Sequence, residues 1–297
     1  MRALASFFCV ALILPAGFAH AELYYLIVGG LGGDPVYAER FADDASAMVA
    51  AAERTLGGAE RIRVFSGEEA TRDALRASLA ELGNNTEPSD RLAVFLVGHG
   101  SYDGQEYKLN LKGEDIGGSE LGDLLAAVPA QSQLIVNMTS ASGSVLESWT
   151  ADGRAVITAT RSGAERNATR FAEHWAEALS AEDADVNKNG SISAQEAFDY
   201  TASRVADSFA ADGALATEHP ELRGDAASAF EVSRLAARVA LTPELEGLHS
   251  RLAELEEQVA VLRLSREALG EDYLAQLQEL LVELALVQQQ IDEAAAE

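Results

Sequence analysis

The sequence predicts an α/β domain built on a mostly parallel sheet with helices on both faces. Three apolar runs carry this prediction, because each suits a buried strand and each ends in glycine or small polar residues. They occupy residues 23–30, 92–97 and 134–136. Segments with helical spacing of apolar residues separate these runs, and strands that alternate with helices favour a parallel sheet.

The predicted elements follow one another in a regular order. Residues 36–55 repeat apolar side chains at helical spacing, and residues 61–65 suit a short second strand. Thr71 is placed to cap the next helix, whose apolar stripe ends at Leu82. The elements expected after it, in chain order, cover residues 92–97, 118–128, 133–137, 154–159 and 167–180.

Polar residues follow two of the apolar runs at the points where the strands end. His99-Gly100 follows residues 92–97, and Ser140 lies in the small-residue turn after residues 134–136. Right-handed crossovers place both turns at the same edge of a parallel sheet, where open α/β sheets bind their ligands. We therefore expect the imidazole and the hydroxyl to share one site. Taken singly, each residue has a simpler interpretation as a polar residue in a turn.

The His99-Gly100 pair and the sequence Ser-Ala-Ser-Gly from Ser140 resemble the caspase, legumain and gingipain superfamily of cysteine peptidases. That superfamily carries His-Gly after one strand and Cys-x-Ser-Gly after the next, and the resemblance covers about residues 23–200. It implies a caspase-like fold in which His99 is the base and the Gly100 N–H helps to form an oxyanion hole. Ser140 then stands in the nucleophile position.

A serine in that position changes the chemistry expected of the site. A thiol, with a pKa of about 8.5, readily becomes a thiolate beside an imidazole. A serine hydroxyl needs a well-oriented base, usually held by a third group, and neither Asp103 nor Asp115 can be assigned that role from sequence. We expect a secreted pseudo-peptidase that acts as a binding or assembly module. The alternatives are an active peptidase or other hydrolase using Ser140 and His99, and a chain unrelated to the superfamily.

Residues 1–21 have the pattern of a cleavable secretory signal peptide. Arg2 precedes an apolar stretch over residues 7–14, and the sequence Ala-His-Ala ending at Ala21 suits cleavage. The stretch is too short for a membrane span, so we expect a secreted or periplasmic protein without an integral membrane segment. A retained anchor is the alternative. Cys9, the only cysteine, lies in this segment, which leaves the mature chain without a thiol.

The chain is strongly acidic, with 48 Asp and Glu residues against 22 Lys and Arg residues. The formal net charge of −26 disfavours nucleic acid and anionic membrane surfaces as partners. High solubility is the simplest consequence of this charge.

Residues 185–196 match the template of an EF-hand calcium loop, with oxygen-bearing side chains, glycine and glutamate at the required positions. The candidate ligands are Asp185, Asn187, Asn189, Ser191, Ser193 and Glu196. Two of them are carboxylates and the sequence offers no second loop, so we expect a weak Ca²⁺ site with a Kd of about 10⁻⁴–10⁻³ M. A polar turn between helices is the alternative.

From residue 243 the chain has the heptad spacing of a coiled coil, with one stutter near Tyr273. The apolar series runs from Leu245 to Ile291. This pattern predicts self-association, as a dimer, or a helical partner. A hairpin turning near Gly270, or a helix docked on its own domain, is the alternative.

These patterns together divide the chain into four parts. The predicted parts are a signal peptide (1–21), a caspase-like domain (22–207) that includes the EF-hand-like loop, an irregular or helical connector (208–242) and a coiled coil (243–297).

Overall fold

The computed structural model describes residues 21–236, separate positions between residues 247 and 262, and residues 272–294. The chain forms two compact units, Met1–Ala236 and Ala237–Glu297. The signal peptide predicted at the N-terminus lies outside the described residues, as do the predicted heptad positions Leu245 and Leu269. Within the described residues, no helix has an apolar stretch long enough to cross a bilayer.

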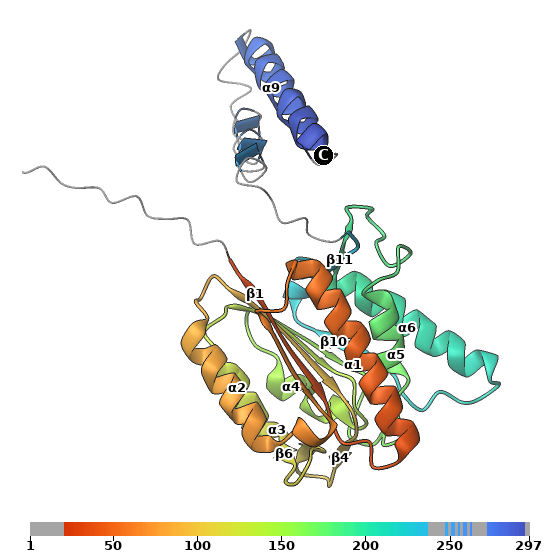
Figure 1. Ribbon diagram of the computed structural model, residues 1–297. Coiled ribbons are helices and arrows are strands. Elements are labelled where there is room, and N and C mark those ends of the chain that lie inside the picture. Colours follow the sequence, from red (N-terminus) through yellow and green to blue (C-terminus); the bar gives the residue numbers. More distant parts are fainter. Residues whose placement is uncertain are drawn as a thin grey trace, which may run out of the picture. The chain divides into compact units, whose positions relative to one another are not determined.

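A six-stranded sheet forms the centre of the first unit and confirms the predicted α/β class (Figure 1). The strand order is β10-β8-β7-β3-β1-β2, and every pairing is parallel except that of the edge strand β10 with β8. The strands are β1 (Leu23–Gly29), β2 (Ile62–Ser66), β3 (Arg91–Val97), β7 (Ser132–Asn137), β8 (Arg154–Thr158) and β10 (Glu221–Arg223).

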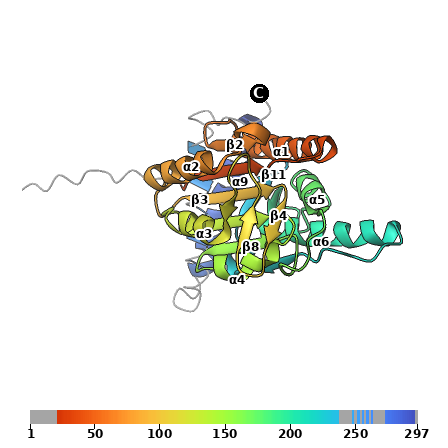
Figure 2. The ribbon, with the colours of Figure 1, turned by 90° about the horizontal axis from the view of Figure 1, so that it is seen from below.

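Helices cover both faces of this sheet, as predicted (Figure 2). One face carries α1 (Pro35–Leu56), α5 (Phe171–Ala178) and α6 (Ala194–Ala211). The other carries α2 (Arg72–Asn85), α3 (Gly118–Ala126) and α4 (Leu146–Trp149). Successive strand side chains point to opposite faces, so Ile27 and Phe95 enter one core while Leu26 and Val94 enter the other. Both cores need apolar residues, which is why the strands read as continuous apolar runs.

Two small sheets flank the central one. β4 (Gly100–Tyr102), β5 (Tyr107–Leu109) and β6 (Ile116–Gly117) form a three-stranded antiparallel sheet directly after β3. β9 (Ser191–Ser193) pairs with β11 (Glu231–Arg234) in a second, two-stranded sheet. Three short 3-10 helices, η1 (Gly67–Glu69), η2 (Ser142–Val145) and η3 (Asp225–Ser228), complete the unit.

Two predicted segments differ from the structure. The helix expected over residues 167–180 is the shorter α5, because Thr169 and Arg170 hydrogen-bond to Met138 and Glu218 and hold the preceding residues in a loop. The segment expected to be irregular from residue 208 begins inside α6 and contains β10, η3 and β11. β10 forms there because it covers the otherwise open edge of β8.

The C-terminal unit contains α9 (Asp272–Ala294), whose apolar seam packs against an earlier stretch of the same chain. The seam residues Leu280, Leu284, Val287 and Ile291 meet Leu248, Leu252 and Leu255. Arg251 and Glu283 form an ion pair beside them. These contacts correspond to the hairpin alternative, and self-association of the unit stays a prediction.

Candidate functional site

The carboxyl ends of β3 and β7 bring the two predicted site turns into contact. A Cβ atom placed on Gly100 would lie 2.3 Å from the carbonyl oxygen of Ser140 and 2.4 Å from the hydroxyl oxygen of Thr139. No side chain fits in that space, so glycine is required for the two backbones to approach. The His99-Gly100 turn and the Ser140 turn therefore form one structural unit.

His99 is held by a backbone carbonyl and two aromatic rings. Its Nε2 lies 3.2 Å from the carbonyl oxygen of Gly32. The imidazole meets the rings of Tyr37 and Phe41 edge-on, with centroid separations of 4.9 and 5.0 Å. Because a carbonyl can only accept, this hydrogen bond requires the proton of neutral His99 on Nε2. Nδ1 then carries the lone pair, and it has no hydrogen bond among the described residues.

The loop between β1 and α1 fixes the carbonyl that orients His99. A Cβ atom on Gly32 would lie 2.3 Å from the backbone nitrogen of Ala38, so the loop is pressed against the first turn of α1. Asp34 caps that helix by accepting a hydrogen bond from the Val36 N–H, and Pro35 opens it. The local sequence that starts α1 therefore also sets the position of the Gly32 carbonyl.

Neither carboxylate near His99 in sequence serves as its third group. Asp103 accepts the N–H groups of Gln105 and Glu106, both at 2.9 Å, and closes a turn. Asp115 accepts the Leu111 N–H at 3.1 Å. The Gly32 carbonyl takes the orienting position instead. Sequence reasoning missed it because a backbone atom leaves no signature in residue type.

The Gly100 N–H lies off the strand ladder. Asn110 donates its N–H to the carbonyl of His99 at 3.0 Å, and Gly100 stands opposite Leu109 in the next pair of the β4–β5 ladder. Hydrogen-bonded and non-bonded pairs alternate in an antiparallel ladder, so the Gly100–Leu109 pair is non-bonded. Its N–H points away from β5, as a donor to an oxyanion would require.

Ser140 lies in a strained, closely packed turn. Its side chain is 3% exposed, and its hydroxyl makes no hydrogen bond with the described residues. The next residue, Ala141, has a left-handed backbone with a φ of 56°. The Ala141 N–H donates to the carbonyl of Glu165 at 2.7 Å, and its carbonyl accepts the Ser144 hydroxyl at 2.6 Å. A non-glycine residue in this region is strained, and such positions cluster at functional sites.

A buried hydrogen-bond network holds the start of this turn. The Tyr107 hydroxyl lies 2.6 Å from the Thr139 hydroxyl and 3.2 Å from the Asn137 side-chain oxygen. Thr139 donates to the same Asn137 oxygen at 2.8 Å. Burial raises the pKa of Tyr107 to about 12, so the phenol stays neutral and remains a donor. The network fixes the backbone immediately before Ser140.

The Ser-Gly of the predicted motif packs against the turn after β8. The Ser142 hydroxyl accepts the Thr160 N–H at 3.2 Å, and the Gly143 N–H donates to the Thr160 hydroxyl at 2.9 Å. A Cβ atom on Gly143 would lie 2.2 Å from the carbonyl carbon of Arg161. Both motif residues therefore position the backbone.

Glu165 joins the Ser140 turn to a distant segment of the chain. Its carboxylate accepts His219 Nδ1 at 2.6 Å, the His219 N–H at 3.1 Å and the Arg161 N–H at 2.9 Å. Partial burial raises the pKa of Glu165, but these N–H donors outweigh it and hold the pKa below its usual value. Glu165 and His219 are 54 residues apart, so their sequence spacing gave no signal.

Glu218, the residue before His219, has a buried carboxyl group. It is 3% exposed and accepts the Arg170 N–H at 2.7 Å through Oε2, while Oε1 has no hydrogen-bond partner. Burial raises the pKa of Glu218 to about 7. This carboxyl is therefore protonated in the folded protein at pH values where an exposed glutamate is ionised.

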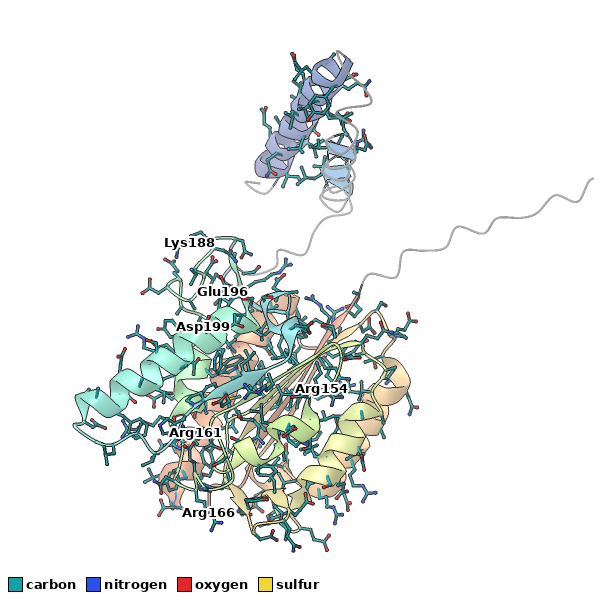
Figure 3. All side chains as sticks on the ribbon, turned by 180° about the vertical axis from the view of Figure 1, so that it is seen from behind. Arg154, Arg161, Arg166, Lys188, Glu196 and Asp199 are labelled. Carbon is teal, nitrogen blue, oxygen red and sulfur yellow. The ribbon has the colours of Figure 1, made fainter. Side chains whose placement is uncertain are left out.

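In Figure 3, Lys188 and Glu196 of the predicted calcium loop lie far from Arg161 and Arg166, which flank Glu165 in sequence. The Asp185 carboxylate, 3% exposed, accepts the N–H groups of Asn189 and Gly190 at 3.1 and 2.9 Å. Glu196 accepts the N–H groups of Asn187 and Ser193 at 3.3 and 2.9 Å. The candidate side chains therefore gather in one turn.

Three features of this loop bear on cation binding. Neither Asp185 nor Glu196 forms an ion pair in the described part of the chain. The residues that the structure describes contain no group of three His, Cys, Asp or Glu side chains suited to a metal. This agrees with a loop that has only two carboxylates. Residues 179–184 separate α5 from the loop, so the expected entering helix ends early.

Comparisons with known proteins give distant structural likenesses. No protein-family model matches the sequence, and no curated protein matches it. A Geobacter sulfurreducens protein, GSU0716, is 14% identical with a TM-score of 0.48, over 73% of this chain and 100% of its own. The Drosophila initiator caspase Dronc is 11% identical with a TM-score of 0.44, over 71% and 81%. Caspase-1 from Spodoptera frugiperda is 12% identical with a TM-score of 0.46, over 69% and 86%.

The pKa of Glu218 predicts a specific pH dependence of stability. Its folded-state pKa of about 7 exceeds the ordinary value of 4.5, so the folded protein binds the extra proton between these values. Stability from this group therefore falls as pH rises from 4.5 to about 7. The Glu218→Gln variant should have a shallower slope of urea midpoint against pH in that window. Exposed Glu147→Gln is the control, and an unchanged slope in Glu218→Gln would exclude Glu218 as the titrating group.

Proposed function

We propose that this chain is a secreted caspase/legumain-like pseudo-peptidase whose Ser140 site binds a peptide segment without cleaving it. The observation that carries the proposal is the packing of the Ser140 turn against the His99-Gly100 turn, with the His99 ring oriented by the Gly32 carbonyl. The signal-peptide pattern at residues 1–21 supports secretion or export to the periplasm.

The chemistry of this pair favours binding over catalysis. Removing the proton from Ser140 would leave an imidazolium at His99, and none of the described carboxylates hydrogen-bonds to that ring. In serine proteases the loss of the carboxylate's orienting role lowers kcat by about 10⁴-fold. A thiolate–imidazolium pair tolerates this arrangement better, because a thiol is a much stronger acid than a serine hydroxyl.

The site nevertheless has two hydrogen-bond donors suited to peptide recognition. The Gly100 N–H stands off the ladder as a donor, and the Ser140 hydroxyl is not committed to another described group. Both groups are donors of the kind that a peptide carbonyl accepts. The alternative, an active hydrolase, is favoured by the same His99 orientation, because an Nε2–H tautomer leaves Nδ1 as a base.

The first test uses the thiol-free background of the mature chain. Wild-type protein should not be labelled by a fluorophosphonate and should not hydrolyse peptides. Because Cys9 lies in the signal segment, Ser140→Cys would be the single thiol. Iodoacetamide should alkylate it about tenfold faster at pH 7 than in Ser140→Cys/His99→Ala, since the imidazole favours the thiolate.

Wild-type peptide hydrolysis that disappears in both Ser140→Ala and His99→Ala would establish the active hydrolase instead. Equal alkylation rates with and without His99 would mean that the two side chains do not form a pair.

We also propose that residues 185–196 bind Ca²⁺. The full match to the loop template supports this, together with two carboxylates, Asp185 and Glu196, that have no cationic partner in the described part of the chain. Burial raises the pKa of Glu196, but hydrogen bonds from Ser193 and Asn187 outweigh it and hold the pKa below its usual value, so the carboxylate carries its negative charge. A divalent cation would neutralise this charge.

Calcium should raise the melting temperature, since a ligand that binds the folded state stabilises it. With a Kd of about 1 mM, 10 mM Ca²⁺ contributes about 1.4 kcal/mol, or a shift of roughly 3–6 °C. Differential scanning fluorimetry measures this shift. Glu196→Gln should lose most of it, and the exposed Glu147→Gln control should keep it. An unmoved wild-type curve would mean that the loop is only a turn.

We propose further that the C-terminal unit mediates self-association or binds a helical partner. α9 leaves large apolar side chains exposed beside its packed seam: Leu274, Leu281, Val282 and Leu286, at 70%, 43%, 53% and 55% exposure. Apolar groups gathered on one helix mark interaction surfaces.

Sedimentation equilibrium at micromolar concentrations tests self-association. The wild-type mature protein should be a dimer, and replacing Leu281 and Leu286 by Gln should shift it toward monomer because apolar contacts are lost. Gln276→Ala, on an exposed part of the same helix, is the matched control. A monomeric wild type would exclude self-association and favour a separate partner.

A further inference from the structure

The candidate calcium loop pairs with a segment from the end of the first unit. Ser191 and Ile192 in β9 stand opposite Arg234 and Ser233 in β11. The pairing continues at both ends, because Leu235 donates its N–H to Gly190 at 3.0 Å and Ala194 donates to Phe230 at 2.8 Å. Residues 230–235 thus lie along positions 6–10 of the loop, where a second calcium loop would be expected to pair.

Hydrogen bonds from distant parts of the chain fix β11 in place. The Ser233 hydroxyl donates to the Leu179 carbonyl at 2.6 Å, and the Tyr25 hydroxyl donates to the Val232 carbonyl at 2.8 Å. The Arg54 side chain donates to the Arg234 carbonyl at 2.7 Å. β11 is therefore held by β1, by α1 and by Leu179, the residue that follows α5.

The core continues through this contact. Ile192 of β9, Val232 of β11 and Phe230, which precedes β11, are at most 1% exposed and belong to the same apolar cluster as α1 and α5. A displacement of either strand would expose these side chains to water. The conformation of the loop and the docking of β11 are for this reason not independent.

The β9–β11 pairing fixes the backbone at one of the candidate calcium ligands. Position 7 of an EF-hand loop binds calcium through its backbone carbonyl, and that position is Ser191. Arg234 is its partner in the ladder. β11 thereby orients one ligand, while Gly190 with a φ of 81° makes the sharp turn before it.

We propose that β11 is the partner strand that shapes this loop for calcium, so that calcium binding and docking of residues 230–235 stabilise each other. The inference rests on the calcium site proposed above. Coupling between two binding equilibria is reciprocal: whatever calcium does to the docking of β11, β11 does to calcium affinity. Since β11 ends two residues before Ala236, the last residue of the first unit, calcium would control how firmly the chain is held at that boundary.

Hydrogen–deuterium exchange of the full-length mature protein tests the first half of the coupling, with isothermal titration calorimetry on the same sample. At Ca²⁺ ten times the Kd, amide exchange in residues 230–235 should slow by about tenfold. Glu196→Gln should abolish the effect. Binding heat without slower exchange in this segment would overturn the coupling and leave the calcium site intact. Absence of binding heat would overturn both.

The calcium affinity of a β11 variant tests the second half of the coupling, the effect of β11 docking on calcium binding. Ser233→Ala removes the hydroxyl that ties β11 to Leu179 and should weaken calcium binding by about twofold to fivefold. Ser148→Ala, which removes a hydroxyl-to-carbonyl bond of 3.1 Å from α4 to Val145, should leave the affinity unchanged. Equal affinities in the two variants would contradict a positioning role of β11, and the exchange measurement on wild type decides the case if Ser233→Ala does not fold.

Discussion

The close approach of Gly100 to the Ser140 carbonyl is the contact on which the candidate site depends. It joins the turn after β3 to the turn after β7, and no residue with a Cβ atom fits between them. On one side of it, His99 is fixed by the Gly32 carbonyl and by aromatic rings of α1. On the other, the Ser140 turn is fixed by the Tyr107 network and by Glu165. The Gly32 loop, α1, Tyr107 and Glu165 thus support the two turns. These turns carry His99 Nδ1 and the Ser140 hydroxyl, neither of which has a hydrogen bond among the described residues.

The sequence predicted the two turns of this site better than the groups that hold those turns in position. Buried parallel strands leave continuous apolar runs, and their ends must meet at one edge, so His99, Gly100 and Ser140 could be placed together from strand order alone. The Gly32 carbonyl could not be found in this way, because a backbone acceptor has no residue type. Glu218 and the Glu165–His219 pair were missed because contacts across about 50 residues follow from the crossovers and not from local spacing.

For the candidate calcium loop, too, the sequence predicted the local residues but not their distant partner. Template spacing predicted a calcium loop over residues 185–196, because EF-hand ligands are close in sequence. The partner of the loop was not predictable, since β11 has ordinary strand sequence in a segment expected to be irregular and meets the loop about 40 residues away. In Figure 3, Lys188 and Glu196 of the loop lie far from Arg161, whose N–H bonds to Glu165 beside the Ser140 turn. Under the proposals above, the loop would act on the chain boundary near Ala236 and the Ser140 site on a ligand.

The proposed site depends on the Gly32 carbonyl, which holds His99 with its proton on Nε2 and leaves Nδ1 as a hydrogen-bond acceptor. Imidazole ¹⁵N chemical shifts measured by NMR on the neutral ring distinguish the two tautomers directly. A His99→Gln spectrum assigns the resonances among the five histidines of the chain. The account predicts a protonated Nε2 and an unprotonated Nδ1. A dominant Nδ1–H tautomer would contradict it, because the Gly32 carbonyl could not then accept a hydrogen bond from the ring.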